Sequence, residues 1–199
     1  MYDLRNAKIA NFFCIFELVR DRKLLNIELG RISADEYTKA GTSGLVVVLD
    51  NVRSAFNVGS AFRTADAFRA DKLVLCGICA TPPSAEIHKS ALGAEFSVPW
   101  EHRKDSLQAI RELREQGYTV VCAEQTEKAV KLNEFTALKG EKYALVFGNE
   151  VDGVQQCLVD EADFCVEIPQ YGTKHSLNVS VSIGIVLWQF LCGKITCSV

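Results

Sequence analysis

The sequence lacks an excess of positive charge. Its 22 lysine and arginine residues are outnumbered by 25 aspartate and glutamate residues, which gives a formal net charge of −3 at pH 7. This balance excludes a nucleic-acid-binding protein that works by bulk positive charge, although a local basic patch remains compatible with it.

The sequence also lacks a long hydrophobic run. No apolar stretch reaches the roughly 18 residues that a membrane-spanning helix needs. The short apolar stretch from Ile9 to Val19 is interrupted by Asn11 and Glu17, and no small-residue cleavage site follows it. We therefore expect a cytoplasmic protein that makes no contact with a membrane.

A third absence is a complete set of zinc ligands. The chain has eight cysteines, but only Cys76 and Cys79 form a C-x-x-C pair, and no second pair of cysteines or histidines completes a four-ligand site. Cys122 and Cys165 lie within apolar runs. We expect buried, reduced thiols that act as small hydrophobic side chains, no metal ion, and a reducing compartment.

What the sequence does contain is a regular alternation of strand and helix patterns. Its 199 residues, 48% of them hydrophobic, suffice for one domain with a sizeable core. Apolar runs typical of strands buried on both faces alternate with segments of helical spacing, which favours an α/β fold with a parallel sheet flanked by helices. Strands are expected at residues 45–49, 72–76, 118–123, 143–147 and 164–168, and helices at 56–68, 106–116 and 176–191.

The start of the chain has a different pattern, and we expect an N-terminal helical extension at 1–43 followed by the α/β domain at 44–199. Apolar residues from Ile9 onward are spaced loosely like one face of a helix. Ser33, followed by acidic residues, predicts the start of a short helix that ends near Gly41.

Ligands of parallel sheets bind beyond the carboxyl ends of the strands, and three segments at such ends are rich in glycine, asparagine and charged residues. In the first, Asn57 is placed to cap a helix and Gly59 permits close backbone approach. Arg63 lies about one and a half turns past Asn57. Asn57 and Arg63 could both face a phosphodiester at the edge of the sheet. The alternative is an ordinary helix cap and a solvated arginine.

The second segment contains Gly148 and Gly153 at the spacing of a phosphate-binding loop. Val154 and Gln155 stand where that loop needs Lys and Ser or Thr to meet phosphate and magnesium, so an ATPase is excluded. The dinucleotide-binding glycine pattern is absent as well. What remains is a glycine-lined turn that presents backbone groups and the carboxylate of Glu150.

The third segment contains Ser176 and Asn178 at the start of the last predicted helix, where backbone N–H groups are unpaired. His175 next to Ser176 does not indicate a hydrolase, because adjacent side chains rarely face each other and no G-x-S-x-G elbow exists. Simple capping of the helix is the alternative to a role in binding.

Together the three segments resemble SpoU-type, or TrmH-type, RNA ribose methyltransferases of the SPOUT superfamily. The resemblance covers roughly Leu45 to Leu191 and keeps the family's order of motifs. His88–Ala94 resembles the segment between the two halves of that domain. The motifs are residues 51–59 with 62–68, residues 146–153, and residues 168–172 with 176–179.

The resemblance implies transfer of a methyl group from S-adenosylmethionine to a ribose 2′-hydroxyl of tRNA or rRNA, with single-domain relatives pointing slightly to tRNA. It also implies a C-terminal trefoil knot in the α/β domain, a homodimer formed through the knotted region, and no metal. A catalytically inactive knotted RNA-binding protein is the alternative. An unrelated nucleotide-binding protein is disfavoured by the failed loop patterns.

The resemblance also implies roles for individual residues. Arg63 would contact the target phosphate and either draw the 2′-proton or only polarise and orient the hydroxyl, because an arginine with a pKa above about 12 is an unusual base. Asn57 would hold the substrate or Arg63, and Glu150 would hold its own turn. The implied catalytic residues are Arg63, Asn57, Glu150, Ser176 and Asn178; the cofactor-binding residues are Glu124 (through its backbone), Gly148, Ile168, Pro169, Ser176, Leu177 and Asn178; the RNA-binding residues are Arg53, Arg63, Lys89 and Lys174.

We predict that Cys76 and Cys79 bind no metal ion, because they form an isolated pair at the end of a predicted strand. Elemental analysis of freshly purified protein without a tag should find no stoichiometric zinc. One zinc ion per chain would contradict the prediction.

Overall fold

The chain divides into two units, residues 1–33 and 34–199. The first unit contains a short 3₁₀ turn, η1 (Asn26–Leu29). The helix expected from Ile9 onward lies outside the described residues. The computed structural model describes residues 22–37, 39 and 41–196.

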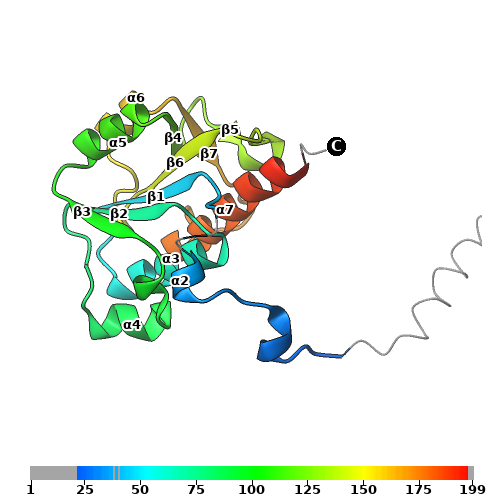
Figure 1. Ribbon diagram of the computed structural model, residues 1–199. Coiled ribbons are helices and arrows are strands. Elements are labelled where there is room, and N and C mark those ends of the chain that lie inside the picture. Colours follow the sequence, from blue (N-terminus) through cyan, green and yellow to red (C-terminus); the bar gives the residue numbers. More distant parts are fainter. Residues whose placement is uncertain (1–21, 38, 40, 197–199) are drawn as a thin grey trace, which may run out of the picture. The chain divides into compact units, whose positions relative to one another are not determined.

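The second unit is built on a seven-stranded sheet in which neighbouring strands are parallel (Figure 1). The order across the sheet is β3-β2-β1-β6-β4-β7-β5. The predicted parallel sheet and its five strands are confirmed, and two short strands are added at the edges. The strands are β1 (Leu45–Asp50), β2 (Lys72–Cys76), β3 (Trp100–Arg103), β4 (Tyr118–Ala123), β5 (Val130–Lys131), β6 (Lys142–Phe147) and β7 (Phe164–Glu167).

Helices lie on both sides of the sheet (Figure 1). One side carries α3 (Ala55–Ala67), α4 (Ala85–Ala91) and α7 (Val179–Thr196), and the other carries α5 (Ser106–Glu115) and α6 (Gln156–Glu161). None of the helices within the described residues is both long and apolar enough to cross a lipid bilayer. The remaining short elements are α2 (Ala34–Tyr37), η2 (Ala94–Phe96) and η3 (Leu132–Glu134).

Alternate residues of each central strand supply two separate cores. In β1, Leu45, Val47 and Leu49 pack in the core that contains α3 and α7 residues, whereas Val46 and Val48 pack with residues of α5 and α6. All five side chains are fully buried. Burial on both faces is the reason that the strand reads as a continuous apolar run.

Helix α2 anchors the start of the second unit to its core. Tyr37 is 3% exposed, and its hydroxyl lies 3.1 Å from the carbonyl oxygen of Ala70 and 3.3 Å from that of Ala65. α2 is shorter than the helix predicted for this segment. The domain boundary expected at residue 43 stays a prediction.

The C-x-x-C pair lies in the core. Cys76 and Cys79 are buried free thiols, and burial raises the pKa of Cys76 to about 12 and that of Cys79 to about 11. The Cys79 thiol donates a hydrogen bond to the carbonyl oxygen of Leu49 at 3.3 Å. In the part of the chain that the structure describes, no cluster of three or more His, Cys, Asp or Glu residues could hold a metal ion.

A buried carboxylate joins the end of β1 to two other elements. Asp50 is fully buried and accepts hydrogen bonds from the Ser106 hydroxyl at 2.6 Å, the Gln155 side-chain amide at 2.7 Å and the Asn51 side-chain amide at 2.9 Å. Its second oxygen accepts the backbone N–H of Gln155 at 3.2 Å. Ser106 opens α5 and Gln155 precedes α6, so one carboxylate links β1 to both helices of that face.

Replacing this carboxylate should destabilise the fold. We expect Asp50→Ala to lower the free energy of unfolding by about 2–4 kcal/mol, because it leaves several donors in the interior without an acceptor. Urea unfolding followed by circular dichroism measures the change. Asp160→Ala is the control, since Asp160 is exposed and accepts a hydrogen bond from the exposed side chain of Gln156, and it should stay within about 0.5 kcal/mol of the parent. Equal effects of the two substitutions would contradict the prediction.

Candidate functional site

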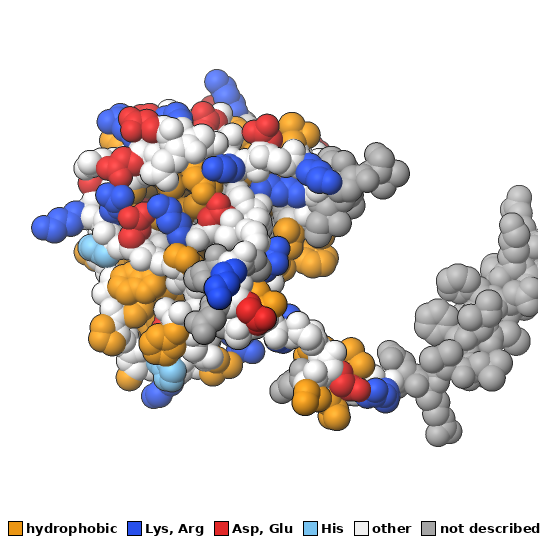
Figure 2. Space-filling view, in the orientation of Figure 1, with side chains coloured by type: hydrophobic (Ala, Val, Ile, Leu, Met, Phe, Trp, Pro, Cys, Tyr) orange, Lys and Arg blue, Asp and Glu red, His pale blue; other side chains and the backbone are white. Residues whose placement is uncertain are grey.

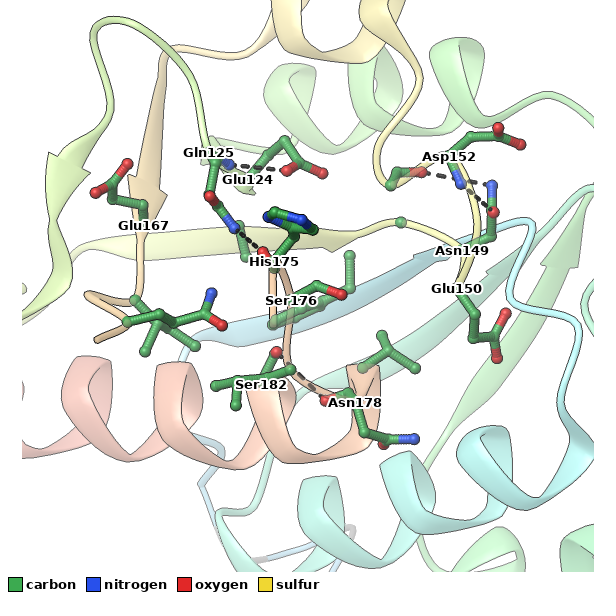
Figure 3. Close-up of a pocket in the computed structure, with 18 of the residues that line it drawn as sticks. Glu124, Gln125, Asn149, Glu150, Asp152, Glu167, His175, Ser176, Asn178 and Ser182 are labelled. Carbon is green, nitrogen blue, oxygen red and sulfur yellow. Dashed lines mark hydrogen bonds between the residues drawn. The ribbon is translucent and has the colours of Figure 1, made fainter. Parts of the chain in front are cut away.

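A pocket of about 500 Å³ lies beyond the carboxyl ends of β4, β6 and β7 (Figure 3). This is the edge of a parallel sheet at which ligands bind in open α/β folds. Loops from three distant parts of the sequence form its walls, which places the second and third predicted segments side by side. The lining residues fall at 123–125, 147–153, 166–168, 170, 175–179 and 182.

The loop after β6 folds back on itself so closely that it excludes a side chain. Asn149 and Gly153 exchange two backbone hydrogen bonds, of 3.1 and 3.2 Å. A Cβ atom on Gly148 would lie 1.9 Å from the carbonyl carbon of Gly153, far inside van der Waals contact. Gly153 itself has a φ of 69°, which favours glycine. The predicted glycine-lined turn is confirmed, and its glycines are required by backbone packing.

Glu124 holds this loop against β4 through its side chain. One carboxylate oxygen accepts the N–H of Val154 at 3.0 Å, and the other accepts the N–H of Gln125 at 2.8 Å. Glu124 was expected to offer its backbone to a cofactor; its backbone N–H donates to the carbonyl oxygen of Val166 at 3.0 Å. That N–H group is therefore committed to the sheet.

A chain of hydrogen bonds connects the three predicted segments. Glu150 accepts the side-chain amide of Asn57 at 2.8 Å, and the oxygen of Asn57 accepts the side-chain amide of Asn178 at 3.2 Å. The oxygen of Asn178 accepts the backbone N–H of Ser180 at 2.9 Å, which caps α7. A carboxylate can only accept, so Glu150 sets the orientation of both amides.

Glu150 is ionised because of the same contacts. Burial alone would raise the pKa of Glu150, but the hydrogen bonds from Asn57 and from the backbone N–H groups of Arg53 and Ser54 outweigh burial and hold the pKa below its usual value. These donors lie at the start of α3, where the helix dipole also favours a negative charge. Glu150 was expected to hold its own turn, and the structure shows that it joins that turn to α3.

The prediction that Asn57 caps α3 is wrong. The N-cap is Ser54, whose hydroxyl accepts the backbone N–H of Asn57 at 3.3 Å. Asn57 stands three residues inside the helix, and its side chain is free to bridge Glu150 and Asn178. Ser54 is an equally strong capping residue in the sequence, and the choice between the two needed the position of the first helical turn.

The third segment is held at the rim of the pocket by its backbone. The side-chain amide of Gln125 donates to the carbonyl oxygen of His175 at 2.7 Å (Figure 3). Ser176 and Leu177 then line the pocket, and both are exposed. Gln125 was missed by the sequence analysis, although it follows a predicted strand at the same sheet edge as the other segments.

Six of the seven residues expected to bind a cofactor line this pocket. The exception is Pro169, which lines an adjoining hollow of about 310 Å³. Whether the residues bind a cofactor stays a prediction. The six are Glu124, Gly148, Ile168, Ser176, Leu177 and Asn178.

Arg63 is not brought to the pocket of its own chain. It is an exposed residue of α3 and is not among the pocket's lining residues. At about 100° of rotation per residue, six residues turn Arg63 roughly 120° away from Asn57 around the helix axis. Asn57 and Arg63 therefore lie on different sides of α3, and the expectation that both face one phosphodiester stays a prediction. Arg53, Lys89 and Lys174, expected to bind RNA, are exposed like Arg63.

Comparisons with known proteins agree with this arrangement. Residues 44–188 match the family model described as the SpoU rRNA Methylase family. The chain is 32% identical over 143 residues to the 23S rRNA (guanosine-2'-O-)-methyltransferase RlmB of Neisseria meningitidis, which is 72% of this chain and 56% of that protein. The chain thus spans about half the length of this relative.

Solved structures share the fold. A TrmH/SpoU tRNA modifying enzyme from A. aeolicus superposes with a TM-score of 0.72 at 29% identity, covering 82% of this chain and 81% of that one. An AdoMet-bound rRNA methyltransferase from Sinorhizobium meliloti superposes with a TM-score of 0.68 at 32% identity, covering 80% and 60%. With its motifs meeting at one sheet edge and its family model matched over most of its length, the chain belongs to the SpoU rRNA methylase family.

Proposed function

We propose that the chain transfers a methyl group from S-adenosylmethionine to the 2′-hydroxyl of a ribose in tRNA or rRNA. The observation that carries the proposal is the hydrogen-bonded chain from Asn178 through Asn57 to Glu150, beside a pocket at the carboxyl ends of three strands. The activity of the Neisseria relative and the AdoMet-bound Sinorhizobium methyltransferase structure support it. Buried free thiols suit action in the reducing cytoplasm.

The pocket suits S-adenosylmethionine in size and in the character of its walls. Its volume of about 500 Å³ falls within the range typical of small-molecule sites. Ile168 and Leu177 offer apolar surface for the adenine ring, and the loop at Gly148 presents backbone with no side chain in the way. When bound, the cofactor supplies a methyl group on a sulfonium, whose departure needs neither a proton nor a metal.

The polar chain acts by positioning. Because the pKa of Glu150 lies below its usual value, the carboxylate is a fixed acceptor at neutral pH and not a proton-transfer group. It keeps the loop after β6, the first turn of α3 and the start of α7 in one arrangement. Proton removal or polarisation at the 2′-hydroxyl then falls to Arg63, whose planar fork of donors suits a phosphate beside a ribose.

We also infer a homodimer through the C-terminal region. Val181, Ile185 and Trp188 are 49%, 38% and 58% exposed at helical spacing on α7, which is a large apolar stripe for a free helix face. Tyr171 in the neighbouring loop is 96% exposed. A second copy that covers this stripe would allow Arg63 of one chain to serve the pocket of the other, because Arg63 does not reach its own.

We further infer a C-terminal trefoil knot. Strand β6 lies between β1 and β4, and β7 lies beyond β4. The chain that leaves β7 is bonded to Gln125 at His175 and reaches α3 at Asn178. This path runs across the ends of β4 and β6, between the loops that follow them, and supports threading of the C-terminal segment through a loop.

Gly148→Val should abolish binding of S-adenosylmethionine, because any side chain at this position collides with the backbone of Gly153 and displaces the loop. Isothermal titration should show binding of S-adenosylmethionine and not of ATP by the parent protein. No binding by the parent would favour the inactive RNA-binding protein instead.

The control for this substitution is Gly41→Val, because a Cβ atom on Gly41 meets nothing within 4 Å. This variant should bind like the parent. Leu177→Asp tests the pocket with little risk to folding, since Leu177 is on the surface, and it should weaken binding at least about tenfold. Unchanged affinity in both Gly148→Val and Leu177→Asp would overturn the pocket assignment.

Arg63→Ala should lower the rate of methyl transfer into RNA by about a hundredfold or more, which is the typical scale for a positioned acid–base group. Affinity for S-adenosylmethionine should stay within a few-fold of the parent. Arg63→Lys should restore little activity, because an ammonium group cannot reproduce the guanidinium fork. Transfer of a labelled methyl group into bulk tRNA and rRNA measures the rate.

Arg111→Ala is the matched control, because Arg111 is an exposed arginine on the opposite side of the sheet and pairs with Glu161 at 2.9 Å. It should keep near-normal turnover. Near-normal turnover in Arg63→Ala would restrict Arg63 to RNA docking.

A further inference from the structure

A second hollow, separate from the pocket described above, lies between α4, η2 and the start of β3. Its volume is about 690 Å³, and its walls include Pro82, Pro83, His88, Phe96 and Trp100. Hydrophobic side chains gather over α4 on this face of the molecule (Figure 2). No part of the site assigned so far uses this hollow, although α4 packs directly against α3.

The hollow also contains a buried carboxylate with an unsatisfied oxygen. Glu95 is 7% exposed and is one of the lining residues. Its Oε1 lies 2.5 Å from Nδ1 of His88, whereas its Oε2 is buried without a hydrogen-bond partner among the described residues. A buried acceptor that lacks a donor costs free energy, so such a group next to a pocket indicates a missing ligand.

The carboxylate is charged. Burial alone would raise the pKa of Glu95, but the hydrogen bond with His88 and the backbone N–H groups of Glu95 and Gly93 outweigh burial and lower the pKa below its usual value. A ligand of this hollow must therefore bring hydrogen-bond donors to an anion that lies among apolar and aromatic groups.

Aromatic side chains give the hollow flat surfaces. Trp100 is held in place by edge-to-face contact with the core residue Phe62, with ring centroids 6.4 Å apart. Phe96 is 77% exposed, and its ring lies 6.1 Å from that of His88. Exposed and half-exposed rings of this kind are the platforms on which proteins stack unpaired nucleobases.

We propose that this hollow binds an unstacked guanine of the RNA substrate, which stacks on these rings and donates its N1–H and N2–H groups to Glu95. The assignment rests on the proposed function, because that function brings RNA to this chain. Guanine is the one common base with two adjacent donors on a single edge, which a carboxylate accepts together. Adenine, cytosine and uracil each place acceptors beside one donor, and the carboxylate repels those acceptors.

The hollow can open toward such a base. The side chain of His88 is 62% exposed, so its ring can swing away from Glu95 with little loss of packing. In the arrangement that we propose, both carboxylate oxygens then face the hollow. The base replaces the imidazole donor and also satisfies Oε2, which the closed arrangement leaves without a partner.

Two exposed cations on α4 and α3 can attract RNA to this face. Lys89 is exposed on α4 next to His88. Gly59 of α3 is so close to α4 that a Cβ atom added to it would lie 2.4 Å from the carbonyl oxygen of Ile87. Arg63 lies about one turn further along α3. These cations attract the phosphates that flank a bound base, and a cationic side chain as the occupant of the hollow is an outcome of the test below.

The test is binding of short single-stranded RNA, followed by fluorescence anisotropy. The oligomer UUGUU should bind the parent protein about tenfold or more tightly than UUAUU, and inosine in place of guanine should fall between them because it lacks the N2 amino group. Glu95→Gln should remove this preference, since the amide presents a donor to the donors of guanine. Glu86→Gln, which changes an exposed carboxylate on the same helix outside the hollow, should keep it.

A second variant tests the rings separately. Phe96 is largely exposed, so Phe96→Ala should fold normally and weaken UUGUU and UUAUU alike, because stacking does not depend on base identity. Equal binding of UUGUU and UUAUU by the parent, or a guanine preference that persists in Glu95→Gln, would overturn the proposal. So would Glu95-dependent binding of an arginine peptide, or binding of free GMP as tight as that of UUGUU.

The outcome is separable from that of the proposed function. The oligomer measurements need no cofactor and no turnover, whereas titration with S-adenosylmethionine and methyl incorporation report on the other pocket. Glu95→Gln should leave the affinity for S-adenosylmethionine unchanged and raise the KM for a guanine-containing RNA substrate. A guanine preference without methyl transfer would support guanine binding in the hollow and contradict the proposed methyltransferase activity.

Discussion

The carboxylate of Glu150 is the contact on which the arrangement of the pocket depends. It is an obligate acceptor, so it fixes the amide of Asn57, and through Asn57 it fixes the amide of Asn178. Each amide then points its oxygen at the next donor, and the series ends at the first turn of α7. Three loops that are far apart in sequence are thereby held by one directional series of hydrogen bonds.

Close backbone packing makes this arrangement rigid. In the loop that carries Glu150, the backbones of Gly148 and Gly153 lie too close together for a Cβ atom on Gly148. Glu124, at the end of β4, holds the loop by accepting the backbone N–H of Val154. Asp50 holds the far end of the same loop at Gln155. Two carboxylates, the half-buried Glu124 and the buried Asp50, therefore fix a loop whose sequence looks flexible, and they do so through hydrogen bonds to its backbone.

The central strands, the helices α3, α5 and α7, and the edge at which the motifs meet could be predicted from the sequence, because buried strands leave a plain apolar signal. The short helices α4 and α6 were not predicted. β3 and β5 could not, since strands at a sheet edge are short and carry polar residues such as those of Trp100–Arg103. The contacts of Asn57 were missed because they depend on which serine or asparagine begins α3. Arg63 does not line the pocket because of its rotational position on α3, which the spacing of the motif alone does not reveal.

Helix α3 lies between the pocket at the ends of β4, β6 and β7 and the hollow at α4, because different faces of the helix contact different neighbours. Asn57 lies on the face toward α7, and Gly59, about 200° further round the axis, lies on the face toward α4. At Gly59 a Cβ atom would lie 2.0 Å from the hydroxyl of Ser90, so α4 can approach this closely only because the residue is glycine. The same helix therefore aligns the loops of the pocket through the amide of Asn57. It also allows α4 to pack closely because Gly59 has no side chain. An RNA strand that used both the pocket and the hollow would be oriented by α3, with Arg63 on the surface between the two faces.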